Sequence, residues 1–479
     1  MLKSPHAASP LTYCNPLPLP DYPRGRCSID PSIMPGGDVL GGDFRETADP
    51  TVLYEADGPN GARWVLYSSA GMAYVSEDFV TWRHHRVEPY DAGYAPTVEK
   101  FRGRYLLTAC TAGLWVSDDA LGPFVEVGPF VDPDGEPVPE WMDPMLFADG
   151  DALFAYWGLG EGGIKGAPLD PDEPRKLLEH PKTLFEFDAS KKWERYGEHN
   201  EDASKSFTEG AWMLKANGKY FLTFAGPGTE FSTYAMGAYV GETPMGPFVY
   251  QRRTPICADR HGLVRGPGHG CIVPGPGGTW WAFYTCAVCV RHMFERRIGM
   301  DPAGFDADGH LFVDAASEAP RRAPGRQPQP HSGNSPEWLP VNHAKQRVTA
   351  SSVAAGRDWI YATDGSMKTW WQPTAGDVLP SLEIELGRTY TLRSCRVVWT
   401  EPQLDYEAGL GPEATGWRLE ARVGGDWKTV VDRWDSTEDW LIDYRACEAV
   451  EADAVRLSWD RARRATAVGV VDWSVFGEG

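Results

Sequence analysis

Five segments of the chain share one pattern, in which a residue at an equivalent position is followed by proline or glycine and an apolar strand. They are ADPTVLY at Asp49, YAPTVEK at Ala95, MDPMLFA at Asp143, TEGAWML at Glu209 and GHGCIVP at His269. Three of these five positions hold carboxylic acids, although the start of an apolar strand has no packing reason to be acidic. Two carboxyl groups suffice to hydrolyse a glycosidic bond, one protonating the leaving oxygen and the other activating water. A third can keep the acid protonated, so the set predicts sugar hydrolysis.

The elements that must position these residues form a repeat. Each segment runs through a turn into a second, aromatic-rich strand: RWVLYSS, RYLLTAC, ALFAYWG, KYFLTFAG and TWWAFYT. The five positions are 46, 48, 66 and 60 residues apart, and a period near 50 with several short strands is typical of propeller blades. We therefore predict a five-bladed β-propeller over residues 10–318. Equivalent positions in successive blades converge at one mouth of the central channel.

A single Asp-Pro pair would mean little, because this dipeptide commonly starts a turn. Three acids in register with a fivefold repeat are a stronger signal. Their mutual repulsion at one channel mouth costs stability, and proteins usually tolerate such a cost for function.

The rest of the chain predicts a second all-β domain. Residues 319–340 are rich in proline and are interpreted as a linker. In the following part, 341–479, apolar and polar residues alternate along the strands, as in the segment LEIEL at 382–386. One buried and one wet face indicate antiparallel sheets, so we predict a jelly-roll-like β-sandwich that folds separately from the propeller.

Composition narrows the function. The formal net charge of −21 argues against nucleic-acid and anionic-membrane partners and favours a neutral substrate. No segment approaches the ~20 apolar residues of a membrane span, and the first residues, MLKSPHAASPLTYC, lack the apolar region of a secretory signal. We expect a cytoplasmic protein with free thiols. Its single CxxC pair, Cys286 and Cys289, has no second pair with which to hold zinc.

The ordered motifs resemble glycoside hydrolase family 43, from NPLPLPDYPRG near Asn15 to FDADGHLFV near Phe312. Members of that family are five-bladed propellers with an Asp base, an Asp that modulates the pKa of the acid, and a Glu acid. The resemblance implies that Asp49 is the base, Asp143 the modulator and Glu209 the acid. Family members commonly have Glu-Gly-Pro at the acid, whereas this chain has Glu-Gly-Ala.

The resemblance also implies substrate-binding residues. The second-blade motif YAPTVEK supplies Tyr94 and Ala95, and ERRIGMDPAGFDADG supplies an arginine, Arg296 first and Arg297 next. Trp212, shortly after the acid, is a candidate platform for a sugar ring. The alternatives are that Trp212 packs between blades and that the two arginines are surface charges.

Two further sites come from resemblance. His269 corresponds to a histidine that often lies beside a structural calcium or sodium ion on the propeller axis; its alternative role is a turn histidine that hydrogen-bonds backbone. No cofactor is expected to be required. The C-terminal domain resembles discoidin-like, galactose-binding-like modules, which would place calcium near Asp364 and sugar contacts at Trp359 or Tyr361. The alternative is a domain that only braces the propeller.

The predicted function is therefore an exo-acting, inverting hydrolase that releases arabinofuranosyl, xylosyl or galactofuranosyl units from oligosaccharides. One alternative is a retaining fructan or sucrose hydrolase, which usually shows Asn-Asp-Pro, Arg-Asp-Pro and Glu-Cys motifs; Ala48, Met142 and Gly210 occupy the discriminating positions. Another is a non-catalytic sugar-binding propeller, which would usually lack at least one acid. The sugar, the linkage and the oligomeric state stay open.

Overall fold

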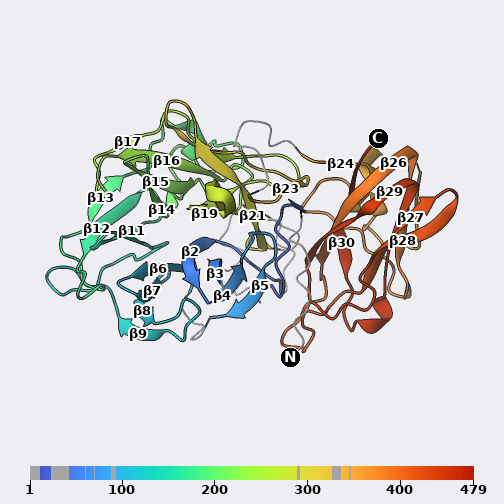
Figure 1. The fold of residues 1–479 in the computed structure, drawn as a ribbon, viewed down its shortest axis with the longest axis horizontal. Helices are drawn as coiled ribbons and strands as arrows, with labels where there is room; N and C mark the ends of the chain where they lie inside the picture. Colours follow the sequence, from blue (N-terminus) through green and yellow to red (C-terminus); the bar gives the residue numbers. More distant parts are fainter. Residues whose placement is uncertain are drawn as a thin grey trace.

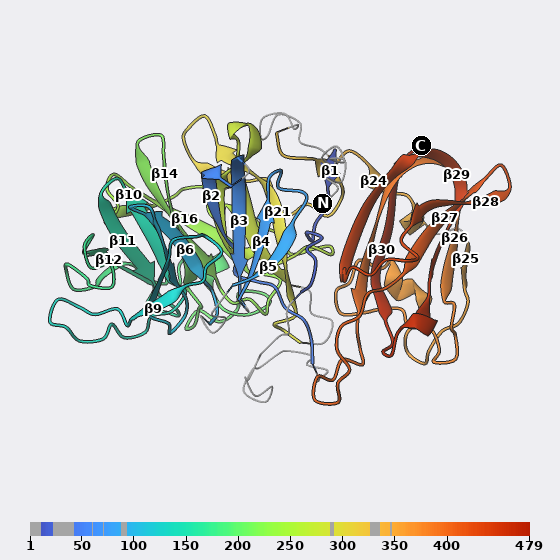
Figure 2. The same ribbon diagram turned by 60° about the horizontal axis from the view of Figure 1, so that its bottom comes forward.

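The computed structural model describes residues 11–22, 43–59, 61–69, 71–87, 93–287, 292–325, 336–344 and 347–479. Nearly all of the regular secondary structure in the described part is β-strand, arranged in a ring of blades beside a second β-domain (Figures 1 and 2). Its described helices are single 3₁₀ turns: η2 (Lys192–Glu194), η3 (Pro276–Gly278), η4 (Asn342–Ala344), η5 (Trp359–Ala362) and η6 (Arg461–Arg463). Within these described ranges no helix has the length and apolar character needed to cross a membrane.

Five antiparallel sheets form the ring, and this confirms the predicted five-bladed propeller. The first sheet contains β2 (Thr51–Gly58), β3 (Gly61–Ser68), β4 (Met72–Ser76) and β5 (Arg83–Arg86). The second contains β6 (Thr97–Phe101), β7 (Arg104–Thr108), β8 (Leu114–Ser117) and β9 (Val125–Gly128). The third contains β10 (Met145–Asp149), β11 (Ala152–Trp157), β12 (Ile164–Leu169) and β13 (Lys182–Phe185).

The fourth blade contains β14 (Glu209–Ala216), β15 (Lys219–Gly226), β16 (Ala235–Gly241) and β17 (Phe248–Tyr250), with β18 (Cys257–Ala258) also paired to β16. The fifth contains β19 (Gly268–Pro274), β20 (Trp280–Ala287), β21 (Arg296–Phe305) and β22 (Leu311–Val313). The first strand of each blade contacts the first strand of the next, and β19 contacts β2, so the ring is closed.

Turn chemistry explains why the first two strands of a blade form tight hairpins. Between β6 and β7 the turn residues Arg102 and Gly103 have φ of 47° and 79°, and between β14 and β15 Asn217 and Gly218 have φ of 52° and 75°. Two successive positive φ values are the mark of a type I′ turn, whose twist matches that of the flanking strands. Separate clusters of buried apolar side chains then fill the contacts between neighbouring blades.

The C-terminal domain is a sandwich-like sheet of seven strands, as the alternation predicted. They are β24 (Leu339–Pro340), β25 (Arg347–Ala350), β26 (Ser381–Thr400), β27 (Trp417–Val423), β28 (Asp426–Asp432), β29 (Ile442–Trp459) and β30 (Gly469–Glu478). The first part of the long β26 pairs with β25 and its second part with β30, while β29 runs along both. Leu382, Ile384 and Leu386 are buried on one face.

Both ends of the proline-rich tract are strands, although the sequence indicated an unstructured linker. β23 (Arg321–Arg322) pairs with β1 (Thr12–Tyr13), and β24 pairs with β30 of the sandwich. Residues 326–335, in the middle of the predicted linker, lie outside the described residues.

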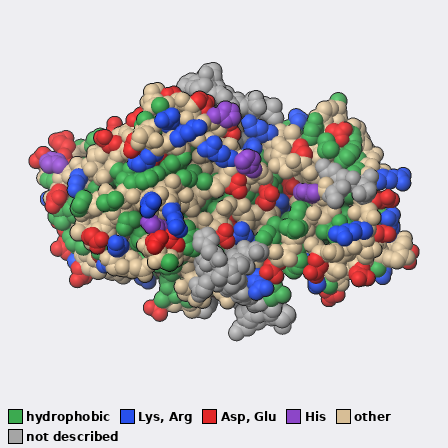
Figure 3. Space-filling view, turned by 90° about the horizontal axis from the view of Figure 1, so that it is seen from above, with side chains coloured by type: hydrophobic (Ala, Val, Ile, Leu, Met, Phe, Trp, Pro, Cys, Tyr) green, Lys and Arg blue, Asp and Glu red, His purple; other side chains and the backbone are tan. Residues whose placement is uncertain are grey.

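The sandwich packs against the side of the propeller formed by blades one and five (Figures 1 and 2). One apolar cluster includes buried side chains of blades one and five and of the sandwich. A buried ion pair, Arg396 with Asp472 at 3.0 Å, lies in the sandwich, and Arg396 also donates a 2.7 Å hydrogen bond to the carbonyl of Glu318. On the face seen in Figure 3, acidic and basic side chains are interspersed.

Candidate active site

Four of the five repeat positions have backbone in the left-handed region. The φ values are 52° for Asp49, 50° for Ala95, 47° for Asp143 and 36° for His269. This conformation costs roughly 1–2 kcal/mol for a residue with a Cβ and is typically retained where function requires it. In these four blades the shared conformation turns the chain sharply at or just before the first strand.

The fifth position, Glu209, reaches the mouth by a different local structure. Glu209 is the first residue of β14, and the register between β14 and β15 shifts between Glu209 and Trp212. Such a bulge re-aims a side chain. The next residue, Gly210, has φ of 60°, and a Cβ built on it would lie 2.8 Å from the His269 ring. The glycine after the acid is therefore required by both conformation and space.

Asp49 is buried and held by an arginine. Arg296 donates from Nη1 to Oδ1 at 3.1 Å and from Nη2 to Oδ2 at 3.2 Å, and the Ser69 hydroxyl donates to Oδ2 at 2.6 Å. Burial alone would raise the pKa of Asp49, but the charges of Arg296 and then His269 outweigh it, and the pKa is lowered. Asp49 is thus kept ionised, as a general base must be.

Arg296 has a second buried acid as its partner. Its Nε and Nη2 donate to Oε1 of Glu46 at 2.8 and 2.6 Å, and the Tyr94 hydroxyl donates to the other oxygen of Glu46 at 3.1 Å. The pKa of Glu46 is raised by burial, although Arg296 opposes this. Glu46 and Asp49 thereby fix the position of the Arg296 guanidinium.

Glu209 has the opposite electrostatics. Its side chain is buried, and the Tyr234 hydroxyl donates to Oε1 at 2.5 Å. Burial raises the pKa of Glu209 well above its usual range, and the nearby charge of Asp143 raises it further. This shift favours the protonated form of Glu209, which is the form that a general acid needs.

Asp143 and His269 lie between Asp49 and Glu209 and contact both sides of the site. Oδ2 of Asp143 accepts a hydrogen bond from the N–H of Gly210 at 3.3 Å, and Oδ1 accepts one from the Cys110 thiol at 3.0 Å. Nδ1 of His269 lies 3.4 Å from an oxygen of Asp49 and 3.4 Å from an oxygen of Asp143. The structure thus brings together the three acids and the histidine that the repeat singled out.

Three of the predicted substrate-binding residues, Arg296, Tyr94 and Ala95, lie at or beside the site. Arg296 is at the site, and Tyr94 reaches it through Glu46. Ala95 is buried, with its N–H donated to the Ser69 hydroxyl at 3.0 Å. Arg296 and Arg297 are both buried, so the surface-charge alternative is wrong.

Two of the predicted residues need a correction. The indole N–H of Trp212 donates to the carbonyl of Ile272 at 3.1 Å, and the ring packs on the apolar clusters between blades, as the packing alternative predicts. The guanidinium of Arg297 donates to the backbone carbonyls of Arg45 and Arg296 at 2.8 and 2.7 Å. Both side chains are committed to the framework, and we do not place them in substrate binding.

Sequence reasoning missed Glu46, Tyr234 and a set of three residues that end the second strand of a blade. Ser69, Cys110 and Thr285 each accept a hydrogen bond from the backbone N–H of the next blade's first position, at 3.0, 3.2 and 2.8 Å. A signal for this set was present, because the strands RWVLYSS, RYLLTAC and TWWAFYT all end in a small polar residue or cysteine.

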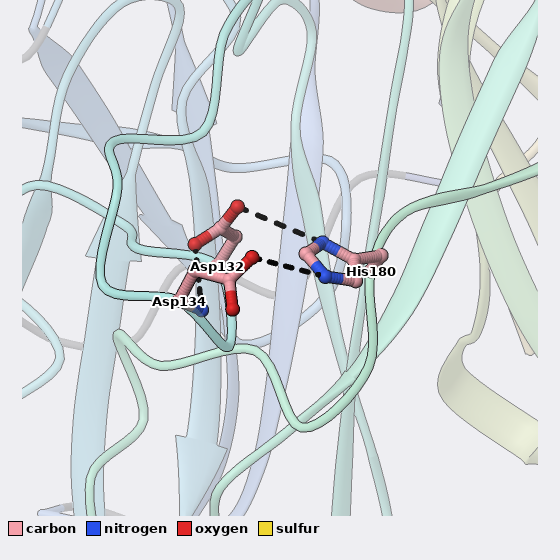
Figure 4. Close-up of side chains that lie close together, drawn as sticks. All are labelled: Asp132, Asp134 and His180. Atoms are coloured by element: carbon pink, nitrogen blue, oxygen red, sulfur yellow. Dashed lines mark hydrogen bonds and ion pairs between the residues drawn. The ribbon is translucent and has the colours of Figure 1, made fainter.

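Among the described residues, three groups of acidic and histidine side chains place potential metal ligands close together. Asp132, Asp134 and His180 meet on exposed loops (Figure 4), where each ring nitrogen faces a different carboxylate at 3.6 and 3.4 Å. Asp306, Asp308 and His310 form a second, partly exposed group within the single turn between β21 and β22. The first group resembles an ion pair between loops, and the second an ion pair within a turn.

The third group is Asp143, Glu209 and His269, whose potential ligand atoms lie within 4.8 Å of one another. Calcium takes six to eight oxygen ligands, whereas this group offers one ring nitrogen and two carboxyl groups that have other partners. The described residues alone do not fit a calcium ion, so no catalytic step is assigned to one. The thiol of Cys286 is buried and free, and Cys289 lies outside the described residues.

Comparison with known proteins identifies the family. The family model of glycosyl hydrolases family 43 matches residues 54–311. The chain belongs to this family. The matched range starts after Asp49 and includes Asp143, Glu209 and Arg296.

Curated relatives of this family 43 protein include a xylosidase/arabinosidase of Bacteroides ovatus, 28% identical over 238 residues, with 42% of this chain and 64% of the relative covered. A β-xylosidase of Xylanibacter ruminicola is 25% identical over 232 residues, with 42% and 64% covered. A β-D-galactofuranosidase of Aspergillus niger is 24% identical over 247 residues, with 44% and 64% covered. The chain spans slightly less than two thirds of the length of these relatives.

Proposed function

We propose that this protein hydrolyses glycosidic bonds, with Asp49 as general base, Glu209 as general acid and Asp143 as the residue that keeps Glu209 protonated. One observation carries the proposal: two buried carboxyl groups of one site have pKa values shifted in opposite directions. Arg296 lowers the pKa of Asp49, while burial and Asp143 raise that of Glu209. Pairs of carboxyl groups separated in this way are the mark of acid and base assignments.

The chemistry follows from these charge states. Ionised Asp49 takes a proton from a water molecule as it attacks the anomeric carbon, and protonated Glu209 delivers its proton to the leaving oxygen. Because the base activates water and does not itself bond to the sugar, the anomeric configuration inverts. Such a pair needs its carboxyl groups roughly 6.5–9.5 Å apart, compared with roughly 5–5.5 Å for a retaining pair.

For the substrate we propose exo-action on oligosaccharides that end in arabinofuranosyl, xylosyl or galactofuranosyl units. The printed activities of the curated relatives support this set, since they name xylosidase, arabinosidase and β-D-galactofuranosidase. The family match argues against the fructan-hydrolase alternative. A purely sugar-binding propeller would have no use for a carboxyl group held protonated beside an arginine-bound carboxylate.

The test combines activity with stereochemistry. Aryl arabinofuranoside, xyloside and galactofuranoside are assayed, and NMR identifies the first-formed anomer. We expect inversion, loss of turnover on every substrate with Asp49→Asn, and activity of Glu209→Gln only toward good leaving groups, which need little protonation. A product of retained configuration, or a glycosyl-enzyme trapped on Asp49, would refute the assignment.

Three sequence predictions remain proposals of the same kind. They are the ion beside His269, sugar binding by the C-terminal domain with its discoidin-like fold, and a cytoplasmic location. None of the catalytic steps above depends on them.

A further inference from the structure

Two acids of the C-terminal sandwich hold a propeller residue that lies next to the candidate active site. Nε of Arg45 is 2.8 Å from Oε2 of Glu401, and its Nη2 donates to Oδ1 of Asp439 at 3.0 Å. Glu401 directly follows β26, and Asp439 lies shortly before β29. The side chains of Arg45 and Glu401 are only 2% and 3% exposed, so this ion pair is shielded from solvent.

The backbone around Arg45 is bound to the start of β21. Arg297 donates to the carbonyl of Arg45 at 2.8 Å, and the N–H of Thr47 donates to the carbonyl of Arg296 at 3.2 Å. The residue between them is Glu46, which receives two hydrogen bonds from Arg296. The path from the sandwich to the proposed base therefore has four contacts in series, and each is a buried ion pair or a direct chain neighbour.

The sandwich makes further contacts with this segment and with the N-terminal residues that precede it. Oδ2 of Asp43 accepts a 2.6 Å hydrogen bond from the N–H of Tyr406, and the N–H of Asp21 donates to the carbonyl of Asp439 at 3.0 Å. Glu401 also accepts a hydrogen bond from Arg464 at 3.1 Å. Glu401 thus lies between two buried guanidinium groups, those of Arg45 and Arg464.

We propose that Glu401 and Asp439 are positioning residues for catalysis, acting through Arg45, Glu46 and Arg296 to fix the carboxylate of Asp49. A buried guanidinium that loses one of its carboxylates becomes an uncompensated charge and shifts toward water. Residues 45–49 then move with it, and the bidentate contact of Arg296 with Asp49 loosens. The sandwich would then help to hold the catalytic base in place. This inference rests on the proposed function.

Other contacts in the same interface provide matched controls. Asp472 is as buried as Glu401 and pairs with Arg396, which donates to carbonyls of the propeller, but among the described residues no contact leads from it to residues 43–49. Glu438 is the chain neighbour of Asp439, 61% exposed, and pairs with Arg433. Asp472→Asn tests for general loosening of the interface, and Glu438→Gln for a change in the loop's charge.

The experiment compares Asp439→Asn and Glu401→Gln with these two controls in the full-length chain. Misplacement of a catalytic group by about 1 Å costs up to ~100-fold in rate, so we expect kcat/KM to fall between about 10- and 100-fold. The acid limb of the pH–rate profile should move to higher pH, because Asp49 loses part of its contact with Arg296. His269, Ser69 and Thr285 also contact Asp49, and Glu46, Glu209, Tyr234 and Cys110 interact with its charge; none of these residues is replaced in the variants.

A second readout does not depend on activity. Hydrogen–deuterium exchange of peptides covering residues 43–49 should be faster in Asp439→Asn and Glu401→Gln, and unchanged in Asp472→Asn and Glu438→Gln. If the wild-type protein cleaves no aryl glycoside, the proposed function fails while the exchange result still tests the coupling. Folded variants with wild-type exchange, or with a wild-type acid limb in an active enzyme, would overturn the proposal. It is equally overturned if Asp472→Asn has the same effects.

Discussion

The replacement Asp143→Asn tests the electrostatic role of the acid between the proposed base and acid. It removes one negative charge from a buried site while nearly preserving side-chain shape. Because the charge of Asp143 raises the pKa of Glu209, its removal should lower that pKa. The alkaline limb of the pH–rate profile, where Glu209 loses its proton, should therefore move to lower pH.

The size of the effect follows from the separation of the two carboxyl groups. Their ligand atoms lie within 4.8 Å of each other, and two unit charges at this distance interact by about 3 kcal/mol at an effective dielectric constant of ~20. The hydrogen bonds that Asp143 accepts from the N–H of Gly210 and the thiol of Cys110 offset part of this field. Since a factor of ten in protonation corresponds to ~1.4 kcal/mol, we expect the alkaline limb to fall by about one to two pH units.

The assay is the pH dependence of kcat with a substrate whose leaving group is poor, because such a substrate requires the acid. Asp306→Asn, in the turn between β21 and β22 of the last blade, is the matched control and should leave both limbs in place. If the alkaline limb of Asp143→Asn stays at its wild-type position or moves to higher pH, the role given to Asp143 is contradicted.

Four further predictions address other parts of the molecule. Tyr234→Phe removes the hydroxyl that lowers the pKa of Glu209, so the alkaline limb should rise by up to about one pH unit, opposite to Asp143→Asn. Burial raises the pKa of Glu99 from 4.5 to about 8. Because Glu99 ionises more easily in the unfolded chain, it destabilises the folded state increasingly as the pH rises between those values. Glu99→Gln should therefore raise Tm relative to wild type at pH 8 but not at pH 4. Chelation should lower Tm or activity if an ion binds beside His269, and an unchanged Tm and rate would contradict that ion. Limited proteolysis should cut first within residues 319–340, and a first cut within 93–287 would contradict the predicted domain boundary.

The parts of this protein that sequence could predict are those that repeat. The blade pattern recurs five times, and equivalent positions in a closed ring must meet, so Asp49, Asp143, Glu209 and His269 could be grouped without coordinates. Alternation along LEIEL likewise predicts a half-buried strand. These inferences need only local periodicity and the symmetry of the ring.

Residues that occur once in the site could not be found in this way. Glu46 and Arg296 are 250 positions apart, and neither belongs to the repeated motif, so their pairing depends on how blade five closes against blade one. Trp212 shows the opposite failure, since its closeness to Glu209 in sequence favoured a sugar contact. Its indole ring lies instead between blades, because β14 contains a bulge just before it.

The hydrogen bonds made by Ser69, Cys110 and Thr285 give a physical reason why the acids are held so closely in register. Each side chain ends the second strand of one blade and accepts the N–H of the first position of the next. The strained backbone at Asp49, Ala95 and Asp143 is thereby stabilised by a neighbouring blade and not by its own sheet. The geometry of the proposed acid and base is consequently a property of the closed ring, and a substitution that loosens one blade contact should disturb the acid supported across it before it unfolds the blade.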